Sequence, residues 1–516
     1  MTKLGRTPFG LAACEAELEE LKQFETEYSE LYFDDTPFNG PSIQPETYLI
    51  IGRRGSGKTA LTQYFSFQTE INNPIYIDVN EPKEFQRVLS EISARASEAR
   101  QIAIPRLEKV WQYVIWCVIF EHTRKQSPAI SEACDGACST GRVSHLINSM
   151  FERLMNWLHE PSEQIVDMRI EQLISNEQFE AGKKEVLKIA SKRPIIIAFD
   201  TLEKCNTNDD ALMNAMAALV QCAADFNLKY RRKGIHLKVF MLGEVFPYLE
   251  EDVLQNPSKS IQDPVYLFWR PKDLLRLISW RFYCHLQAND LLLPQSKGQI
   301  NWTNHREVLD KMWIPYFGEY LNNSRGLREH TFSYVLRHTQ MRPRQLILMC
   351  NAIARRAQES GRFPKASEKD VLTAIKDIEP ALAREIINSF SETYGNVGGI
   401  VDALKTIPMV FKGNELDRRA SQSASAWKDG YTQDRFRRLV TELGIVGLVR
   451  RHNEEAGYID ADFEYSLKER LTVTHRDTCV IHPMFYSRLN VEFNSPSRVM
   501  PFSTEREEQE TDGVFA

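Results

Sequence analysis

The chain has 516 residues, of which 42% are hydrophobic and 26% charged, and its formal net charge is −6. This composition is typical of a folded protein with several domains and excludes a disordered or fibrous chain. The negative net charge gives no global attraction to nucleic acid, so a contact with DNA would require a local basic patch.

The sequence contains no segment that we expect to enter a membrane. Its most apolar run, residues 110–120, has roughly half the length of a membrane-crossing helix, and the polar N-terminal sequence lacks the apolar region of a signal peptide. Nine scattered cysteines indicate free thiols. The close pair Cys134 and Cys138 lacks two further ligands at suitable spacing, so we expect a flexible loop there rather than a zinc site. We therefore expect a cytoplasmic protein.

The first predicted element is an acidic helix within an N-terminal helical segment, residues 1–45. Residues 12–31 combine many glutamates with apolar residues at helical spacing. A helix of this composition is typical of a solvated or docking surface rather than of a catalytic site.

A short apolar strand, Tyr48–Ile51, then runs directly into a glycine-rich loop. The loop sequence GRRGSGKT has the spacing G-x-x-x-x-G-K-[ST], and a helix is expected from Lys58 onwards. Glycines allow backbone N–H groups to wrap a phosphate, and the helix N-terminus adds a partial positive charge. A strand before the loop and a helix after it disfavour the alternative, a glycine turn without a ligand. We expect these residues to bind ATP or ADP: Gly52, Gly55, Ser56, Gly57, Lys58, Thr59 and Ala60.

A second buried strand supplies the acidic partner that such a loop needs. Ile195–Phe199 is a β-rich apolar run after a proline, and it ends in Asp200, with Glu203 three residues later. We expect Asp200 and the Thr59 hydroxyl to hold Mg²⁺, and Glu203 to polarise the water that attacks the γ-phosphate. The predicted catalytic residues are Lys58, Asp200 and Glu203. The alternative is a strand that ends in surface acids.

The remaining strands of this domain complete an alternating α/β pattern over residues 46–270. Strands are expected at residues 74–80, 235–242 and 264–269, with helical periodicity over most of residues 81–190. This order predicts an α/β fold: a P-loop NTPase parallel sheet with an all-α insertion.

Two further domains and a tail are expected after the sheet. Residues 271–395 contain helices that begin at Pro271 and Pro343 and read as a helical lid. Residues 396–493 read as a winged helix, with a helix ending at Gly444, a strand, a polar wing tip and two more strands. Residues 494–516 are polar and acidic and are expected to be a disordered tail.

In this order, the loop, the strand ending in Asp200 and the helices with the patterns "DLLRLI" and "RPRQLI" resemble the ATPase core of STAND proteins and of the Cdc6/origin-recognition branch of AAA+. More narrowly, the chain is similar to bacterial P-loop ATPases found near antiphage defence genes. The resemblance implies that Arg344 touches the nucleotide phosphates and that His482, at a strand-to-helix junction, contacts the ADP β-phosphate. The Asp that usually follows this histidine is Pro483 here, and a local role at the start of a helix is the alternative.

The family's arginine finger has no clear counterpart in this sequence. Residues 243–269, where AAA+ proteins place it, contain no arginine, and Arg231, Arg232 and Arg270 are the nearest substitutes. Without a finger, hydrolysis should be slow, because such an arginine is worth about 10³ to 10⁵ in rate.

We therefore expect an ATPase that acts as a slow conformational switch. The resemblance implies that it oligomerises with further copies of itself and works with a separately encoded effector or sensor in bacterial antiphage defence. The alternative is a DNA-binding initiator or loader ATPase whose winged helix meets phosphates through Arg435–Arg438, Arg450 and Arg451. A small-molecule kinase would need an acceptor pocket, in which a winged helix has no place.

Overall fold

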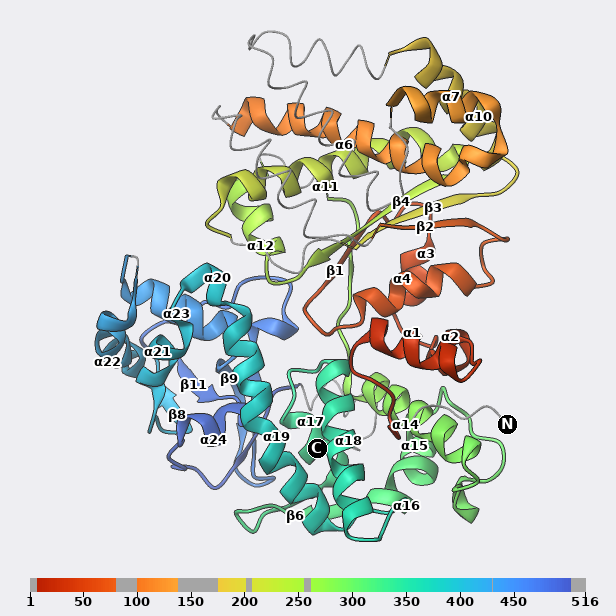
Figure 1. Ribbon diagram of the computed structural model, residues 1–516. Coiled ribbons are helices and arrows are strands. Elements are labelled where there is room, and N and C mark those ends of the chain that lie inside the picture. Colours follow the sequence, from red (N-terminus) through yellow and green to blue (C-terminus); the bar gives the residue numbers. More distant parts are fainter. Residues whose placement is uncertain are drawn as a thin grey trace. The chain divides into compact units, whose positions relative to one another are not determined.

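The computed structural model describes residues 7–79, 100–137, 175–200, 207–254, 261–428 and 430–502. The chain divides into two compact units (Figure 1). Unit 2 comprises residues 37–54 and 58–267, and unit 1 comprises residues 1–36, 55–57 and 268–516.

Unit 2 is built on a five-stranded parallel sheet with the strand order β2-β3-β4-β1-β5. Its strands read as continuous apolar runs because both faces of a parallel sheet are covered, and all eight residues of β4 are buried. The strands are β1 (Leu49–Gly52), β2 (Ile75–Val79), β3 (Ile195–Asp200), β4 (Ile235–Leu242) and β5 (Val265–Tyr266). The strands expected from the sequence are thus confirmed: β4 has the expected end points, and those of the other strands differ by at most three residues.

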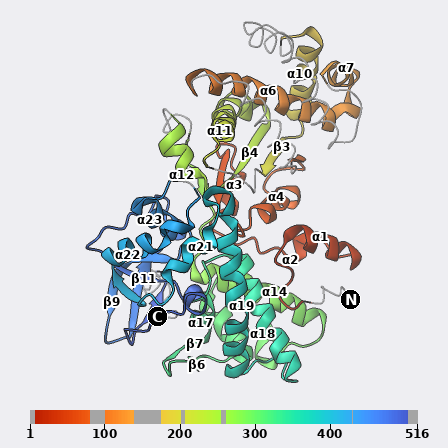
Figure 2. The ribbon, with the colours of Figure 1, turned by 60° about the vertical axis from the view of Figure 1, so that its left-hand side comes forward.

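Helices cover both faces of this sheet (Figures 1 and 2). Helix α4 packs against β2 and β3, while α11 packs against β4 on the other side and carries α6 on its outer face. Within the described residues, the helices of unit 2 are α3 (Asn39–Ile43), α4 (Lys58–Phe67), α6 (Arg100–Thr123), α7 (Pro128–Ala137), α10 (Glu177–Ala190), α11 (Asp210–Tyr230) and α12 (Phe246–Tyr248).

The described part of the insertion is helical, as expected, but one segment differs from the prediction. The sequence around Cys134 was expected to be a flexible loop, and the structure has α7 there. Ile130, Ala133 and Cys134 are buried against the rest of the insertion, and this burial outweighs the low helix propensity of Gly136. Cys138 lies outside the described residues. The Cys134 thiol donates to Glu121 Oε2 at 3.0 Å.

Unit 1 begins with the N-terminal segment, which packs on the helices that follow residue 268. Glu17 and Arg281 form a buried ion pair, and the Asn351 side chain bonds the backbone of Phe9 and Gly10. The acidic helix therefore docks on its own chain. The helices are α1 (Cys14–Gln23), α2 (Tyr28–Leu31), α14 (Pro271–Ala288), α15 (His305–Val308), α16 (Ile314–Phe317), α17 (Thr331–Arg337), α18 (Pro343–Glu359), α19 (Glu368–Ser389) and α20 (Ser391–Tyr394), with the hairpin β6 (Tyr320–Asn322) and β7 (Arg328–His330).

The C-terminal part of unit 1 contains a second five-stranded sheet, of order β12-β10-β9-β11-β8. Strands β9 and β10 form a hairpin that turns at residues 454–457, where the sequence predicted a polar wing tip. The elements are α21 (Val397–Val401), β8 (Val410–Lys412), α22 (Asn414–Ser423), α23 (Gln433–Glu442), β9 (Val446–Asn453), β10 (Tyr458–Asp462), β11 (Thr478–Ile481), α24 (Tyr486–Leu489) and β12 (Arg498–Met500).

Two features of unit 1 differ from the sequence-based expectation. The regions expected as lid and winged helix share one continuous hydrophobic core and belong to one compact unit. The segment from Asn494 was expected to be disordered, yet β12 pairs in parallel with β10. Val499 and Met500 are buried there, and the polar composition of the tail as a whole had hidden this short apolar run. Among the described residues, no helix is long and apolar enough to cross a membrane.

Candidate functional site

The glycine-rich loop lies at the carboxyl end of β1, between that strand and α4. Gly55 and Gly57 have φ angles of +76° and +99°, in the left-handed region that favours glycine. A Cβ at Gly243, after β4, would lie 3.0 Å from Arg53 Cγ and 3.3 Å from Arg53 N, so a larger residue would crowd the loop where β4 ends beside it. Ligands of open α/β sheets bind at this edge, outside the carboxyl ends of the strands.

Lys58, the first residue of α4, turns back over the loop. Its ammonium donates to the carbonyl oxygens of Gly52 (2.9 Å) and Arg53 (3.3 Å), and the side chain is buried. The charge is thus held at the mouth of the loop, beside the N-terminus of α4. Both features favour an anion at this position.

Thr59 and Asp200, predicted as the pair that holds a metal ion, meet directly. The Thr59 hydroxyl donates to Asp200 Oδ2 at 2.9 Å. Asp200 is the last residue of β3, and β4 separates that strand from β1, so the contact is made across the sheet edge by the first turn of α4. The two oxygens belong to the ligand types that Mg²⁺ prefers.

A second acid lies beside α4 that sequence reasoning had missed. The Gln63 side chain donates to Asp78 Oδ2 at 3.3 Å, and Gln63 lies one helical turn after Thr59. Asp78 is on β2, directly next to β3 in the sheet. The signal was present in the sequence, because the run "IYIDV" also places an acid at the end of an apolar strand.

Glu244, just after β4, contacts the loop itself. Its Oε1 accepts a hydrogen bond from the backbone N–H of Arg54 at 3.1 Å, and the N–H of Gly243 donates to Gly52 O at 3.1 Å. The sequence analysis predicted no function for Glu244. A carboxylate on a loop N–H occupies a donor that would otherwise be open to an anion.

The tip of the loop, residues 55–57, groups with unit 1, where it meets Trp269. The indole N–H of Trp269 donates to Ser56 O at 2.8 Å. The buried Ser56 hydroxyl has no hydrogen-bond partner among the described residues. An unsatisfied buried hydroxyl is costly, and a ligand oxygen at the loop would relieve that cost.

The loop, Lys58 and the Thr59–Asp200 pair therefore fit a nucleoside triphosphate with Mg²⁺. The described residues hold no cluster of three or more His, Cys, Asp or Glu suited to a metal ion. Mg²⁺ does not require one, because it commonly takes one or two protein ligands and completes its shell with waters and phosphate oxygens. Glu203, the predicted base, lies outside the described residues, and its role stays a prediction.

Arg344 is the second residue of α18 in unit 1, and its guanidinium is partly exposed. Nη2 lies 3.4 Å from Glu385 Oε1, with the two side chains 46% and 49% exposed. A pair at this exposure contributes little to stability, so the guanidinium can change partners at low cost. The predicted contact with phosphates stays a prediction.

His482, also in unit 1, is fully buried and makes local hydrogen bonds. Its Nδ1 accepts from the N–H of Met484 at 3.1 Å, and Nε2 lies 2.8 Å from the Tyr465 hydroxyl. Burial lowers the pKa of His482 well below its ordinary value, so the ring is neutral and Nε2 carries its proton. This is the local role that the sequence offered as the alternative to a phosphate contact. The contact itself stays a prediction.

The three substitutes for an arginine finger lie in different settings. Arg270 forms an ion pair at 2.7 Å with the buried Asp273 at the start of α14. Arg231 and Arg232 precede β4, at the amino end of the strand, whereas the loop lies at the carboxyl ends. Eight residues of strand span roughly 26 Å, so these two arginines cannot reach the loop of their own unit.

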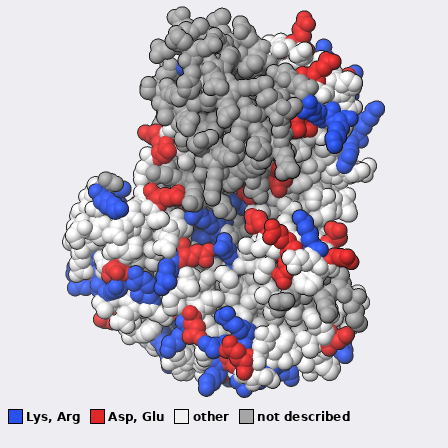
Figure 3. All heavy atoms as spheres, in the orientation of Figure 1, with Lys and Arg blue, Asp and Glu red and all other residues white. Residues whose placement is uncertain are grey.

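The arginines predicted to meet DNA are largely paired within unit 1. Arg437 pairs with Asp417 at 2.6 Å and donates to Val473 O, and Arg438 forms two hydrogen bonds with Glu464, at 2.5 and 2.7 Å. Figure 3 shows other Lys and Arg side chains gathered over the C-terminal part of unit 1, with acidic residues among them. Exposed basic residues of that part include Lys412, Arg418 and Arg476.

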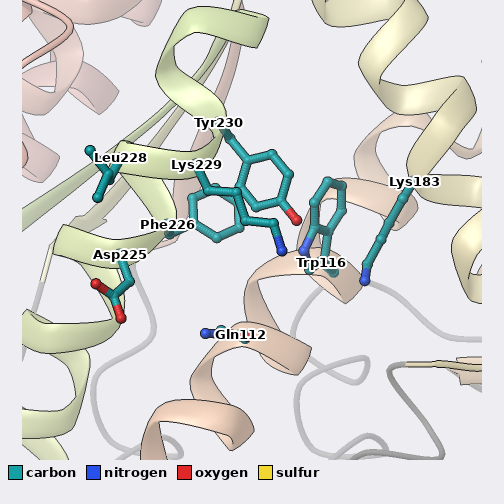
Figure 4. A pocket seen from close by; sticks show the side chains of 8 residues that line it. All are labelled: Gln112, Trp116, Lys183, Asp225, Phe226, Leu228, Lys229 and Tyr230. Atoms are coloured by element: carbon teal, nitrogen blue, oxygen red, sulfur yellow. The ribbon is translucent and has the colours of Figure 1, made fainter.

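A cavity of about 500 Å³ lies between α6, α10 and α11 in unit 2 (Figure 4). The rings of Trp116 and Tyr230 lie 5.1 Å apart, edge to face, and are only 2% and 7% exposed. Lys183 pairs with Glu180 at 2.7 Å, and its ammonium lies 5.5 Å from the centre of the Trp116 ring. Both rings line the cavity, and their edge-to-face contact packs the insertion on α11.

Comparison with known proteins gives one match. Residues 310–386 match a family described as the FunZ-associated C-terminal helical domain. No curated protein and no solved structure matches the chain. The matched segment lies in unit 1, includes α17 and α18 with most of α19, and contains Arg344. This part of the chain is therefore similar to that helical domain.

Proposed function

We propose that the protein binds ATP and hydrolyses it slowly, and that the bound nucleotide sets its conformation. The observation that carries the proposal is the Thr59–Asp200 hydrogen bond of 2.9 Å beside a loop whose glycines have left-handed φ angles. This arrangement combines a loop suited to phosphate with two oxygen ligands suited to a metal ion. A glycine turn that binds no ligand would not require these oxygen ligands.

The residues divide the chemistry between them. The backbone of residues 52–57 and the N-terminus of α4 bind the phosphates, and Lys58 neutralises the terminal oxygens. Thr59 and Asp200 would hold Mg²⁺, which supplies charge neutralisation and orients the phosphates. Glu203, three residues after Asp200, orients the attacking water and accepts its proton. Turnover is slow because residues 243–269, where an arginine finger would be expected, contain no arginine.

A slow ATPase suits a switch better than a motor. ATP and ADP can shift a conformational equilibrium only by the difference of their affinities for the two states. Arg344 is the candidate reporter of the γ-phosphate, because its weak, exposed ion pair with Glu385 can be exchanged for a phosphate contact. We further propose that the C-terminal part of unit 1 is a winged-helix domain whose wing is the β9–β10 hairpin.

The biological setting rests on resemblance. The sequence is similar to STAND and Cdc6/origin-recognition ATPases, and the match to a FunZ-associated helical domain is compatible with a neighbourhood of defence genes. We infer a role in bacterial antiphage defence, in the cytoplasm, as a homo-oligomer that works with a separately encoded effector or sensor.

The test is particle size by mass photometry, with ADP, ATP and a slowly hydrolysed ATP analogue. If the proposal holds, the analogue changes the assembly of the wild type and leaves Lys58→Ala unchanged. Lys192→Ala is a matched control, because it removes one exposed ammonium just before the amino end of β3 and should respond as the wild type does. A wild type that stays the same in all three nucleotides would contradict the switch.

A DNA-binding ATPase is the second candidate, favoured by the basic side chains in Figure 3. Arg437 and Arg438 are largely buried in their ion pairs, so contacts with DNA phosphates would come from the exposed Lys412, Arg418 and Arg476 instead. Of these, Arg418 would exchange its exposed ion pair with Glu415 for a phosphate. The triple alanine variant should then bind duplex DNA more weakly, with a shallower salt dependence of log Kd. Indifference of the wild type to DNA would exclude this candidate.

A further inference from the structure

Lys238, in the middle of β4, is a fully buried lysine that forms no ion pair with a carboxylate of the described residues. Its exposed fraction is 0%, and its ammonium donates to the carbonyl oxygens of Gln44 and Thr47, both at 2.6 Å. Burial lowers the pKa of Lys238 to about 7, and the negative charge of Glu46 acts in the opposite direction. Such a group costs folding free energy, so its two hydrogen bonds point to a task that an apolar side chain could not perform.

The two carbonyl groups belong to a turn that connects the units. The chain passes from unit 1 to unit 2 between Thr36 and Pro37 and then forms α3. A turn follows, closed by the hydrogen bond from the N–H of Thr47 to Gln44 O at 3.1 Å, and leads into β1. We call residues 37–47 the connector. Without Lys238, the buried Thr47 carbonyl would lose its donor, at a cost of roughly 1–3 kcal/mol.

Strand β4 also touches the glycine-rich loop. Gly243 and Glu244 follow its last residue and bond the backbone of Gly52 and Arg54. Lys238 lies five to six residues earlier on the same segment, roughly 17–20 Å away along the chain. A buried central strand of a parallel sheet is stiff. Strand β4 is therefore a rigid element that contacts the loop at its carboxyl end and the connector through the Lys238 side chain.

We propose that Lys238 is a positioning residue that anchors the connector to β4, so that a change at the loop is passed to the chain that leads to unit 1. The transmission rests on the proposed nucleotide switch, whereas the anchoring does not. Because β4 bonds both the loop and the connector, a movement of the loop against Glu244 reaches the turn at Gln44 and Thr47 through Lys238.

The experiment combines hydrogen exchange with the nucleotide response in Lys238→Met, which keeps the length of the side chain and removes its donors. Lys238→Gln, which keeps a neutral donor, is the second variant should the first fold poorly. Lys233→Met is the matched control, because Lys233 is an exposed lysine just before β4. In the nucleotide-free full chain, amides of residues 38–48 should exchange at least tenfold faster in Lys238→Met, while those of α11 keep their wild-type rates.

The same variant should bind the ATP analogue within about threefold of the wild type and yet lose the change in assembly. Unchanged exchange in residues 38–48 would overturn the anchor, as would an equal rise across the whole of unit 2, which indicates a packing role alone. Faster exchange with a wild-type response would overturn the transmission. If the wild type itself shows no response to the analogue, the proposed switch fails, and the exchange data still decide the anchor.

Discussion

The glycine-rich loop and the C-terminal part of unit 1 differ in how far the local sequence indicates which residues come into contact. At the loop, residues 141 positions apart were expected to act together, and Thr59 and Asp200 are in hydrogen-bond contact. In unit 1, His482 and Arg438 were given binding roles, and both are hydrogen-bonded to neighbours of their own unit. A loop motif constrains the backbone and its strand order, whereas a single histidine or arginine can be satisfied by any nearby partner.

The largest expected effect is on the loop side of this comparison. Asp200→Asn removes the charge that faces Thr59, and we expect turnover to fall at least about 10²-fold, because charge neutralisation around the phosphates dominates phosphoryl transfer. ATP turnover under saturating nucleotide measures it. Asp210→Asn, which alters an acid in the first turn of α11, is the control and should retain wild-type turnover. Equal turnover in Asp200→Asn and the wild type would mean that the Thr59–Asp200 contact has no role in ATP hydrolysis.

Glu203→Gln extends the comparison to a residue of the chain that lies outside the described residues. The amide cannot accept the proton of the attacking water, so we expect ATP to remain bound while turnover falls at least about tenfold. Nucleotide affinity and single-turnover rate, measured on the same sample, separate the two effects. Undiminished hydrolysis would mean that another acid, such as Asp78 or Glu244, is the base.

His482→Phe tests the unit 1 side. The replacement removes the hydrogen bonds of His482 with the Tyr465 hydroxyl and the Met484 N–H, and the loss at the buried Met484 N–H alone costs about 1–3 kcal/mol. Urea unfolding should therefore show a lower midpoint, and ADP affinity should stay at the wild-type value. A loss of ADP affinity without a loss of stability would instead establish the phosphate contact implied by the resemblance.

The smallest expected effect is the pH dependence contributed by Lys238. Its pKa is about 7 in the folded chain and near 10.5 when exposed, so between these values the unfolded chain carries a proton that the folded chain lacks. The free energy of unfolding of the wild type should therefore rise relative to Lys238→Met as the pH increases from 7 to 9. Burial lowers the pKa of the nearby His236 to about 4, so it is neutral in the folded chain throughout this range, and its contribution cancels because both proteins contain it. A constant difference over this range would contradict a titrating anchor.

The strands of unit 2 could be predicted because each is a short apolar run bounded by turn residues, and the site followed from the acid that ends β3. Other features had no local signal. The place of β4 between β1 and β3, the contact of Glu244 with Arg54 and the burial of Lys238 arise from packing between distant segments. In unit 1, the sequence showed a cluster of arginines, but their acidic partners come from other elements, such as Asp417 and Glu464.

Equilibrium binding of ATP in the presence of Mg²⁺ tests the central claim most directly, by calorimetry on the wild type and on Lys58→Ala. The ammonium of Lys58 makes charge-assisted hydrogen bonds worth about 1.5–3 kcal/mol each, so we predict saturable binding to the wild type and an affinity at least about tenfold lower in the variant. Wild-type protein that binds no nucleotide, or a variant that binds as tightly as the wild type, would contradict the account.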